Sequence, residues 1–338
     1  MKRLDFEAHF YNQGYVDKLY QQKGYPRFGL DEETKGRRLW YNAEVGQPFA
    51  DVLLNVLLDL GEGRLAKMDK CGIDVQILSL SAPGAEQLDP AVGSVVARNA
   101  NDFLSAVINK YPDRFMGYAA LAPKDPAQAA VELERCVKEL GFRGWNAHSN
   151  FGDSYLDDKK YLPILRKAAE LEVPVYIHPT VPAISEVRGY GFALAGAPFG
   201  FGLEGALCMM RLIYSGVFDI CPNLKVILGH LGEGLPFIYK RIDWAWERPF
   251  DPAARPKLLR KPSEYLKDNV FVTTSGNHFT PAFMCTREVL GVENILLGTD
   301  YPYEDLEECV GFLESLPVPQ DEKEAIYSGN AHRLGFTI

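Results

Sequence analysis

The chain has 338 residues, 47% of them hydrophobic and 24% charged, which is the composition of a globular protein long enough for a large core. Its formal net charge of −9 and its pI of about 5.3 argue against a broad electrostatic attraction to nucleic acid or to an anionic membrane. An acidic chain can still hold an anionic substrate through one or two local arginines or through a metal ion.

The first predicted element is a hydrophobic strand over residues 4–10. Glu7 and His9 are two residues apart, so their side chains point to the same face of an extended strand. Both residue types bind metals, but both are also ordinary on an edge strand that faces solvent. Residues 11–50 are rich in aromatic residues, glycine and charges, with no sustained period. We expect this stretch to be a long active-site arm or cap insertion.

From residue 51 onward, apolar strand-like runs alternate with amphipathic helical patterns. The Asp-Pro pairs at 89–90 and 125–126 are typical of helix starts. Further strands are predicted at residues 73–80, 114–121, 142–147, 173–178, 224–230, 269–275 and 294–300. Helices are predicted at residues 51–71, 90–111, 126–141, 158–171, 203–216, 233–247, 280–290, 305–316 and 320–334. A polar, proline-rich excursion is expected at 249–262.

Eight strands, each followed by a helix, predict an α/β protein with the (β/α)₈ TIM-barrel fold, an N-terminal arm insertion and C-terminal helices. A doubly wound sheet would need a glycine-rich phosphate turn after an early strand. The candidate glycines, Gly61 and Gly63, interrupt a helical pattern and do not follow a strand. We therefore predict one barrel domain over residues 1–338, with the cap or arm insertion at about 11–50.

The cysteines are scattered and include no C-x-x-C pair, so we expect reduced thiols, and neither a disulfide framework nor a zinc knuckle. The N-terminus leads directly into a strand that carries charges, which predicts no signal peptide. No apolar run approaches the roughly 20 residues needed to cross a bilayer. These features together predict a cytoplasmic protein without nucleic-acid or membrane partners.

Polar side chains gather at the predicted strand ends, where barrel enzymes place their chemistry. Four of the six histidines lie at such ends, namely His9, His148, His178 and His230. Glu7, His178 and Asp300 together offer one imidazole and two carboxylates, a set that suits Zn²⁺, Mn²⁺ or Fe²⁺ with open positions. Taken singly, a strand-end histidine is often a structural hydrogen-bonding group, and Asp300 has the alternative role of a helix N-cap.

His230 and Glu233 are three residues apart at a strand-to-helix turn. This spacing allows the carboxylate to orient the imidazole as a base-and-orienter pair, although Glu233 has the alternative role of a helix cap. His278 follows the seventh strand, where it can line the barrel mouth, and His332 is expected to be structural. Phe10, Phe199, Phe201 and Tyr303 are candidates to pack against a substrate ring, or are core residues.

Several segments, taken in order, are similar to those of one family. They include the opening EAHF at 7–10, and the segments at 64–69, 72–74, 77–83, 101–102, 111–115, 141–142 and 177–179. The most specific are LGHLGEGLP at 228–236, RID at 241–243, TSGN at 274–277 and TDYPY at 299–303. Nearly the whole chain resembles the metal-dependent decarboxylases of the amidohydrolase superfamily, in the aminocarboxymuconate-semialdehyde decarboxylase branch. Within it, the likeness is to the γ-resorcylate, 2,3-dihydroxybenzoate and 5-carboxyvanillate decarboxylases.

The resemblance implies one divalent metal ion, Zn²⁺ or Mn²⁺, held by Glu7, His178 and Asp300, with His9 as a further ligand or a close neighbour of the ligands. It implies a carboxy-lyase that removes CO₂ without oxidation from an ortho-hydroxybenzoate-type acid, after the ring carbon has been protonated. Asp300 is then the expected proton donor, and His230 with Glu233 the expected acid–base pair. The alternatives are a mononuclear metal-dependent hydrolase of a lactone or amide, and a non-catalytic metal-dependent binding protein.

The expected substrate contacts are Arg241, His148, Phe199 and Tyr303. Arg241 matches a family position implicated in substrate contact, and that contact can cross a subunit interface. His148 departs from the family, because relatives carry asparagine at the end of the fourth strand, and the arm at 11–50 does not align with theirs. The family likeness and the arm predict a homodimer or homotetramer, with a small aromatic carboxylic acid as the bound partner.

Overall fold

The strand β1 (Leu4–Phe10) is buried along its whole length and is one strand of the barrel wall. In the computed structural model, which describes residues 2–248, 253 and 256–336, β1 pairs in parallel with β5 (Val75–Leu80). On its other side, Ala8 forms a parallel bridge with Tyr301. Strands covered on both faces are hydrophobic nearly throughout, which explains the continuous apolar runs in the sequence.

The strand β6 (Phe115–Gly117) pairs in parallel with β5 and completes the first sheet, in the order β1-β5-β6. A second parallel sheet has the order β11-β10-β9-β8-β7. Its strands are β7 Trp145–His148, β8 Val175–His178, β9 Val226–Leu228, β10 Val270–Thr273 and β11 Ile295–Leu296. The bridge from Ala119 to Trp145 joins the end of β6 to β7, and the bridge from Ala8 to Tyr301 joins β1 to the end of β11. The ring of strands is therefore closed, and the predicted barrel is confirmed.

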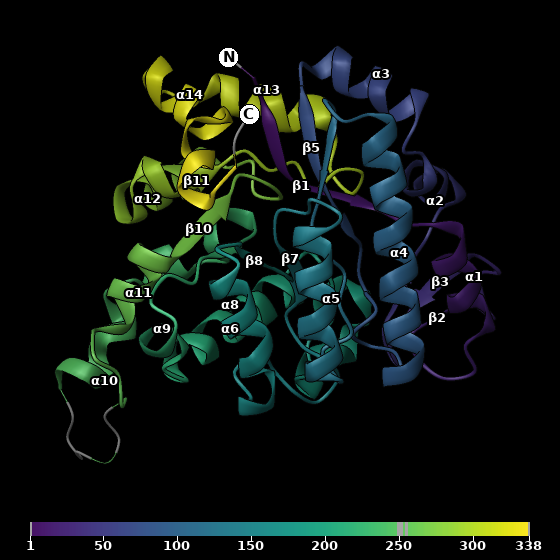
Figure 1. Cartoon of the computed structure of the whole chain (residues 1–338), viewed down its shortest axis with the longest axis horizontal. Coiled ribbons are helices and arrows are strands. Elements are labelled where there is room, and N and C mark those ends of the chain that lie inside the picture. Colours follow the sequence, from purple (N-terminus) through teal and green to yellow (C-terminus); the bar gives the residue numbers. More distant parts are fainter. Residues whose placement is uncertain (1, 249–252, 254–255, 337–338) are drawn as a thin grey trace.

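Helices cover the outside of this ring (Figure 1). Their bounds are α2 Asp51–Leu58, α3 Glu62–Cys71, α4 Pro90–Lys110, α5 Pro126–Lys138, α6 Leu162–Glu170, α7 Phe192–Ala195, α8 Gly200–Tyr214, α9 Val217–Ile220, α10 Trp244–Glu247, α11 Pro262–Asn269, α12 Thr280–Leu290, α13 Leu306–Ser315 and α14 Gln320–Tyr327. Both predicted Asp-Pro starts are helix caps: the Asp89 carboxylate accepts from Ala91 N–H, and the Asp125 carboxylate accepts from Gln128 N–H.

Short 3₁₀ turns connect several of these elements, at η1 Lys159–Tyr161, η2 Ser185–Tyr190, η3 His230–Gly232, η4 Leu235–Ile238, η5 Arg241–Asp243, η7 Val292–Asn294 and η8 Gly329–Leu334. They account for a wrong prediction, because residues 233–247 are not one helix but the turns η4 and η5 followed by α10. Glu233 and Gly234 have φ values of 52° and 76°, which a right-handed helix cannot include.

Two other predicted helices are interrupted. The helix expected at 51–71 is split into α2 and α3, because the Asp59 carboxylate accepts hydrogen bonds from the N–H groups of Gly61 and Arg64 and starts a new helix. The helix expected at 320–334 ends at Tyr327 and continues as η8, which contains His332. Part of the excursion expected at 249–262 lies outside the described residues.

The arm at 11–50 contains regular structure that its aperiodic sequence did not indicate. It consists of α1 (Gln13–Gln21) and a small antiparallel sheet of β2 (Arg27–Leu30), β3 (Arg37–Trp40) and β4 (Gly46–Pro48). Buried aromatic rings pack within it, with Phe28 and Phe49 5.2 Å apart between centroids, and both residues belong to the same core cluster as residues of the barrel strands and helices. That the arm belongs to a single domain with the barrel stays a prediction.

A β-bulge in β1 decides which side chains reach the barrel interior. The pairing of β1 with β5 shifts register between Asp5 and Ala8. Before the bulge, Leu4 and Phe6 belong to the cluster that fills the inside of the barrel. After it, the alternation is reversed, so Ala8 and Phe10 pack toward the outer helices, and Glu7 and His9 face inward. Bulges commonly re-aim side chains in this way next to active sites.

All six cysteines are free thiols, five of them buried, as predicted. Among the described residues, no helix combines the length and the apolar character that crossing a membrane requires.

Candidate active site

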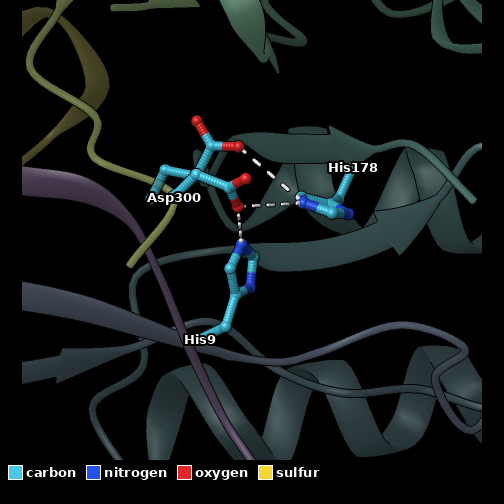
Figure 2. Close-up of side chains that lie close together, drawn as sticks. His9, His178 and Asp300 are labelled. Atoms are coloured by element: carbon cyan, nitrogen blue, oxygen red, sulfur yellow. Dashed lines mark hydrogen bonds and ion pairs between the residues drawn. The ribbon is translucent and has the colours of Figure 1, made fainter. Parts of the chain in front are cut away.

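Four of the predicted residues meet at one point in the barrel mouth. Glu7 and His9 come from β1, His178 ends β8, and Asp300 follows β11. Each offers one ligand atom, and these atoms all lie within 4.8 Å of one another. Figure 2 shows the Asp300 carboxylate facing both imidazoles, 2.8 Å from His9 Nε2 and 3.6 Å from His178 Nε2.

The hydrogen bonds of the two imidazoles leave their Nε2 atoms directed at this point. His178 Nδ1–H donates to the carbonyl of Pro179 at 2.9 Å, and His9 Nδ1 lies 2.9 Å from Ser79 Oγ. His178 Nε2 and Glu7 Oε1 are buried without a hydrogen-bond partner. A buried lone pair and a buried carboxylate oxygen that face each other at 3.8 Å are groups that a bound cation satisfies. The four side chains therefore fit a divalent metal ion.

The Glu7 carboxylate is held in place by two hydroxyl groups to which the sequence assigned no role, although one of them, Ser275, lies in the TSGN segment. Thr273 Oγ1 donates to Glu7 Oε2 at 2.6 Å, and the Ser275 hydroxyl donates to the same oxygen. These bonds fix Oε2 and leave Oε1 free. In the sequence, these hydroxyl residues stand at the polar end of a buried strand. In a barrel the ends of all the strands surround the same mouth, so this position could have indicated a contact with Glu7.

A second buried network supports the end of β1 from outside. Arg64 is 1% exposed, and its guanidinium donates to the backbone carbonyl of His9 at 2.8 Å and to Gln76 Oε1 at 3.2 Å. Gln76 in turn donates to Asp5 at 3.0 Å. Burial raises the pKa of the Asp5 carboxyl to about 7, although hydrogen bonds from Thr299, Gln76 and the backbone oppose the shift. The network fixes the backbone that carries Glu7 and His9.

His230 and Glu233 form the predicted imidazole–carboxylate pair, with His230 Nδ1 2.6 Å from Glu233 Oε1. The pair sits on a tight turn in which both residues have a φ of 52°. His230 Nε2 points back toward the cluster, 3.5 Å from Glu7 Oε1. Burial lowers the pKa of His230, but the carboxylates of Glu233 and Glu7 outweigh it and raise that pKa well above its usual value.

Glycines on α8 make room for this pair. A Cβ atom at Gly202 would lie 3.0 Å from Glu233 Oε2, and one at Gly205 would lie 3.2 Å from Glu233 Oε1. Glu233 is therefore packed against α8, and a side chain larger than glycine at 202 or 205 would crowd its carboxylate. This geometry fixes the ring plane and the tautomer of the imidazole.

Asp300 is an anion in the arrangement of the structure. Burial raises the pKa of its carboxyl, but hydrogen bonds and charge interactions with His178 and His9 outweigh that effect and hold the pKa below its usual value. A role as proton donor therefore requires that Asp300 first take up a proton.

A cavity of about 1110 Å³ opens from the cluster toward solvent. His178, His230, Glu233 and Asp300 lie in its wall, as do two of the predicted substrate contacts, Phe199 and Tyr303. The Tyr303 and Ser81 hydroxyls are 2.7 Å apart. The wall also contains residues that the sequence analysis missed, among them Tyr41, Gln47, Asn277 and Glu304. Tyr41 and Gln47 belong to the arm, so the arm does border the site.

The other predicted residues lie elsewhere. His148 is buried inside the barrel beside His178, with ring centroids 5.8 Å apart, but it is not part of the cavity wall. Arg241 is exposed on η5, with its guanidinium 5.7 Å from the centroid of the Trp244 ring. Phe10 is a core residue, and its ring stacks on that of Phe103. His278 packs against Phe312, outside the cavity wall.

His148 has a buried partner in Glu86, whose Oε1 lies 3.0 Å from His148 Nδ1. Gly84, with a φ of 77°, passes directly over this pair. A Cβ atom on Gly84 would overlap the Glu86 carboxylate and lie 2.5 Å from His148 Nδ1. Glycine is therefore needed at this position both for the backbone conformation and for the space.

We expect Gly84→Ala to lower the free energy of unfolding by at least about 3 kcal/mol, because it forces apart a buried imidazole–carboxylate pair. Urea denaturation followed by circular dichroism measures this loss. The matched control is Gly152→Ala, because Gly152 has a φ of 88° and open space around its Cβ position. The control bears only the backbone cost of about 1–2 kcal/mol. Equal losses in the two variants would contradict the predicted clash.

Comparisons with known proteins place this site in context. A family model described as amidohydrolase matches residues 8–334. The gamma-resorcylate decarboxylase of Polaromonas sp. (strain JS666) is 40% identical over 291 residues, which cover 82% of this chain and 88% of that protein. The crystal structure of 5-carboxyvanillate decarboxylase from Sphingomonas paucimobilis matches with a TM-score of 0.87 at 34% identity, covering 98% of both chains.

A dihydroxybenzoic acid decarboxylase from Polaromonas sp. JS666 was crystallised with bound manganese and the inhibitor 2-nitroresorcinol. Its structure matches with a TM-score of 0.83 at 35% identity, and the match covers 98% of this chain and 96% of that one.

Proposed function

The chain belongs to the amidohydrolase family, and on that premise we propose that it is a metal-dependent decarboxylase of hydroxybenzoate-type aromatic acids. The observation that carries the proposal is the convergence of two groups on one cavity. One group is the metal-ligand cluster of Glu7, His9, His178 and Asp300, and the other is the pair of His230 and Glu233. The similarity to gamma-resorcylate and 5-carboxyvanillate decarboxylases supports the same activity.

The four residues would hold one divalent ion. We propose Mn²⁺, because a relative with the same fold was crystallised with bound manganese; Zn²⁺ suits the same nitrogen and oxygen donors. When bound, such an ion supplies Lewis-acid chemistry to the carboxylate and the ortho oxygen of the substrate.

Direct loss of CO₂ would leave an aryl anion, so the ring carbon that bears the carboxylate must be protonated first. Asp300, once protonated, delivers this proton, and the adjacent phenolic oxygen supplies electron density to the ring. The carbon–carbon bond then breaks, and its electron pair restores the aromatic ring. His230 holds the phenolic proton at Nε2, with its ring fixed by Glu233. General acid–base groups placed in this way typically contribute about 10²–10⁴-fold in rate.

The predicted contact between Arg241 and the substrate requires a second copy of the chain, because in this chain Arg241 is exposed and outside the cavity wall. A homodimer or homotetramer that supplies it therefore stays a prediction. The contact predicted for His148 likewise stays a prediction.

The proposed function is tested by incubating the Mn²⁺-loaded protein with hydroxybenzoates, and following CO₂ and the phenol. We expect turnover of at least one ortho-hydroxybenzoate. If the protein were inert toward every phenolic acid but cleaved a lactone or an amide, the proposal would be replaced by a metal-dependent hydrolase.

We expect Glu233→Gln to lower kcat by about 10–100-fold while the metal content is unchanged, because the partner that orients an imidazole typically contributes this much. Glutamine keeps the size of the side chain under α8 and removes the charge that faces His230 Nδ1. Steady-state kinetics with metal analysis measures both quantities. The control is Glu308→Gln, an exposed residue of α13. A wild-type kcat in Glu233→Gln would show that the pair is only structural.

A further inference from the structure

Two polar side chains of the arm, Tyr41 and Gln47, line the cavity. They stand on either side of the turn that joins β3 to β4. The Tyr41 N–H donates to the Val45 carbonyl at 3.0 Å, and the Val45 N–H donates to the carboxamide oxygen of Asn42 at 2.8 Å. Because these hydrogen bonds lie within the turn, they hold Tyr41 and Gln47 in a fixed relation to each other.

Gln47 lies on the face of the small sheet that is turned toward the barrel. It pairs with Leu39 across β3 and β4, and residues directly opposite each other in an antiparallel pair project from the same face. Leu39 is fully buried in the core cluster that the arm shares with the barrel. The side chain of Gln47 therefore points inward, in agreement with its place in the cavity wall.

A hydrogen bond from Tyr41 decides which end of the Gln47 carboxamide stays free. The Tyr41 hydroxyl donates to Gln47 Oε1 at 3.1 Å, and burial raises the pKa of this hydroxyl well above its usual value, so it remains a protonated donor. The Tyr41 ring packs against the rings of Phe192 and Phe201, at centroid distances of 6.5 Å and 6.4 Å. Within the part of the chain that the structure describes, Gln47 Nε2 has no hydrogen-bond partner, so its two N–H groups are free to donate to a ligand.

The two arm residues differ in position from the rest of the polar wall. The other polar residues that the structure describes there end or follow barrel strands; they are Ser81, His178, His230, Glu233, Asn277, Asp300, Tyr303 and Glu304. In the proposed function, the reacting carboxylate and the phenolic oxygen of the substrate lie with the strand-end residues. A group that meets Gln47 is therefore a different substituent of the ring.

Resting on the proposed function, we propose that Gln47 is a specificity-determining residue that donates a hydrogen bond from Nε2 to an oxygen substituent of the ring, such as a methoxy oxygen. Tyr41 is a positioning residue, because its hydroxyl holds the carboxamide with Nε2 available. An alkyl group of the same size would displace water from Nε2 and leave this donor unpaired, which is unfavourable. The arm thereby selects among ring substituents, while the strand ends carry the chemistry.

The test uses two pairs of acids: 2,6-dihydroxybenzoates with methoxy or ethyl at carbon 3, and the same pair at carbon 4. Methoxy and ethyl are similar in size and differ in one hydrogen-bond acceptor. With the Mn²⁺-loaded full chain, the ratio of kcat/KM for the methoxy acid to that for the ethyl acid is measured in the wild type and in each variant. The electronic effect of methoxy on ring protonation is common to all variants, so a change in this ratio reports the contact.

Gln47→Glu is the decisive variant. It keeps the size of the side chain and the acceptor for Tyr41, but it replaces the donor group at Nε2 with a second acceptor oxygen. We expect the methoxy-to-ethyl ratio to fall by about tenfold at carbon 3 or carbon 4, the upper end of what one neutral hydrogen bond contributes. The added charge acts equally on the two acids of a pair and cancels from the ratio. An unchanged ratio at both carbons would overturn the proposal, even if overall activity fell.

Two further variants complete the test. Tyr41→Phe keeps the aromatic packing but releases the carboxamide, so it should lower the same ratio by about threefold; an unchanged ratio would contradict the positioning role of Tyr41. The matched control is Gln21→Glu, at an exposed residue of α1 in the same arm and outside the cavity wall. It should leave the ratio unchanged.

Calorimetric titration separates this proposal from the proposed function. Should none of the acids be decarboxylated, the proposed function fails, but the affinities of the methoxy and ethyl acids still measure the contact. A fall of about tenfold in their affinity ratio in Gln47→Glu would then support the role of Gln47, and an unchanged ratio would overturn it. Failure of every acid to bind would overturn both proposals.

Discussion

Replacement of Asp300 with asparagine is expected to lower kcat for decarboxylation by at least about 10³-fold. The change keeps the shape of the side chain but removes the proton donor, whose contribution alone is typically about 10²–10⁴-fold. It also removes a negative charge from the cluster in which Asp300 Oδ1 faces His9 and His178 at 2.8 Å and 3.6 Å. The amide is a weaker metal ligand than the carboxylate, and it cannot donate a proton to the ring carbon. Single-turnover kinetics with metal analysis measures the two losses separately.

The control for this variant is Asp113→Asn, at an exposed turn outside the cavity wall. It should retain wild-type kcat and metal content. If Asp300→Asn kept its metal and decarboxylated near the wild-type rate, the proton-donor role would be wrong. Loss of activity that is fully restored by excess metal would instead assign Asp300 to metal binding alone.

Removal of the metal ion is expected to abolish activity and to destabilise the fold. Treatment with a chelator should lower kcat at least about 100-fold, because Lewis-acid stabilisation is worth several kcal/mol. The buried carboxylate of Glu7 and the half-buried carboxylate of Asp300 also lose their common cation. An ion present at 100 times its Kd stabilises the native state by about 2.7 kcal/mol, so the Tm should fall by several degrees. Differential scanning calorimetry before and after Mn²⁺ is restored measures this shift.

His178→Gln and His332→Gln form a matched pair for the same question. His178 has a free, buried Nε2 atom in the cluster, whereas His332 is exposed on η8. We expect His178→Gln to lose both the bound ion and the Tm response to Mn²⁺, and His332→Gln to keep both. Retention of the ion by His178→Gln would place the metal elsewhere.

The cavity explains why an arm that carries no catalytic residue is nevertheless part of the proposed site. Tyr41 and Gln47 reach the cavity wall, and the Tyr41 hydroxyl donates to Gln47 Oε1 at 3.1 Å. In the proposed function, a ring whose carboxylate and phenolic oxygen lie at the strand ends would turn its other substituents toward the arm. A change in the arm can therefore alter substrate preference without altering the chemistry.

The repeating pattern of the sequence was sufficient to predict the barrel. Strands and helices can be told apart by the spacing of apolar residues that are close in sequence. The two Asp-Pro caps likewise mark helix starts, because each cap contacts the backbone only a few residues further on. Because parallel strands of a barrel end at the same mouth, the strand-end positions of Glu7, His178 and Asp300 also predicted that they would meet. The pair of His230 and Glu233 followed from a local feature, because residues three apart at a turn can be close enough for the carboxylate to orient the imidazole.

Features that depend on contacts distant in sequence were decided only by the tertiary structure. The arm lacks a period because its small sheet and helix are stabilised by aromatic packing against the barrel, so its order was not visible. Residues 233–247 have a helical apolar pattern, yet the left-handed conformations of Glu233 and Gly234 exclude the first two residues, and the remainder forms the 3₁₀ turns η4 and η5 and the short helix α10. His148 stands at a strand end as His178 does, but its partner Glu86 is 62 residues away, and it lies outside the cavity wall.

The opening strand shows most clearly which features the sequence determines and which the tertiary structure decides. Its sequence determined that Glu7 and His9 share a face, because side chains two residues apart on a strand always do. It did not determine which face, since simple alternation would put them opposite Leu4 and Phe6, which fill the barrel interior. The bulge between Asp5 and Ala8 exists only in the pairing of β1 with β5. That pairing turns both metal-binding side chains inward to His178 and Asp300.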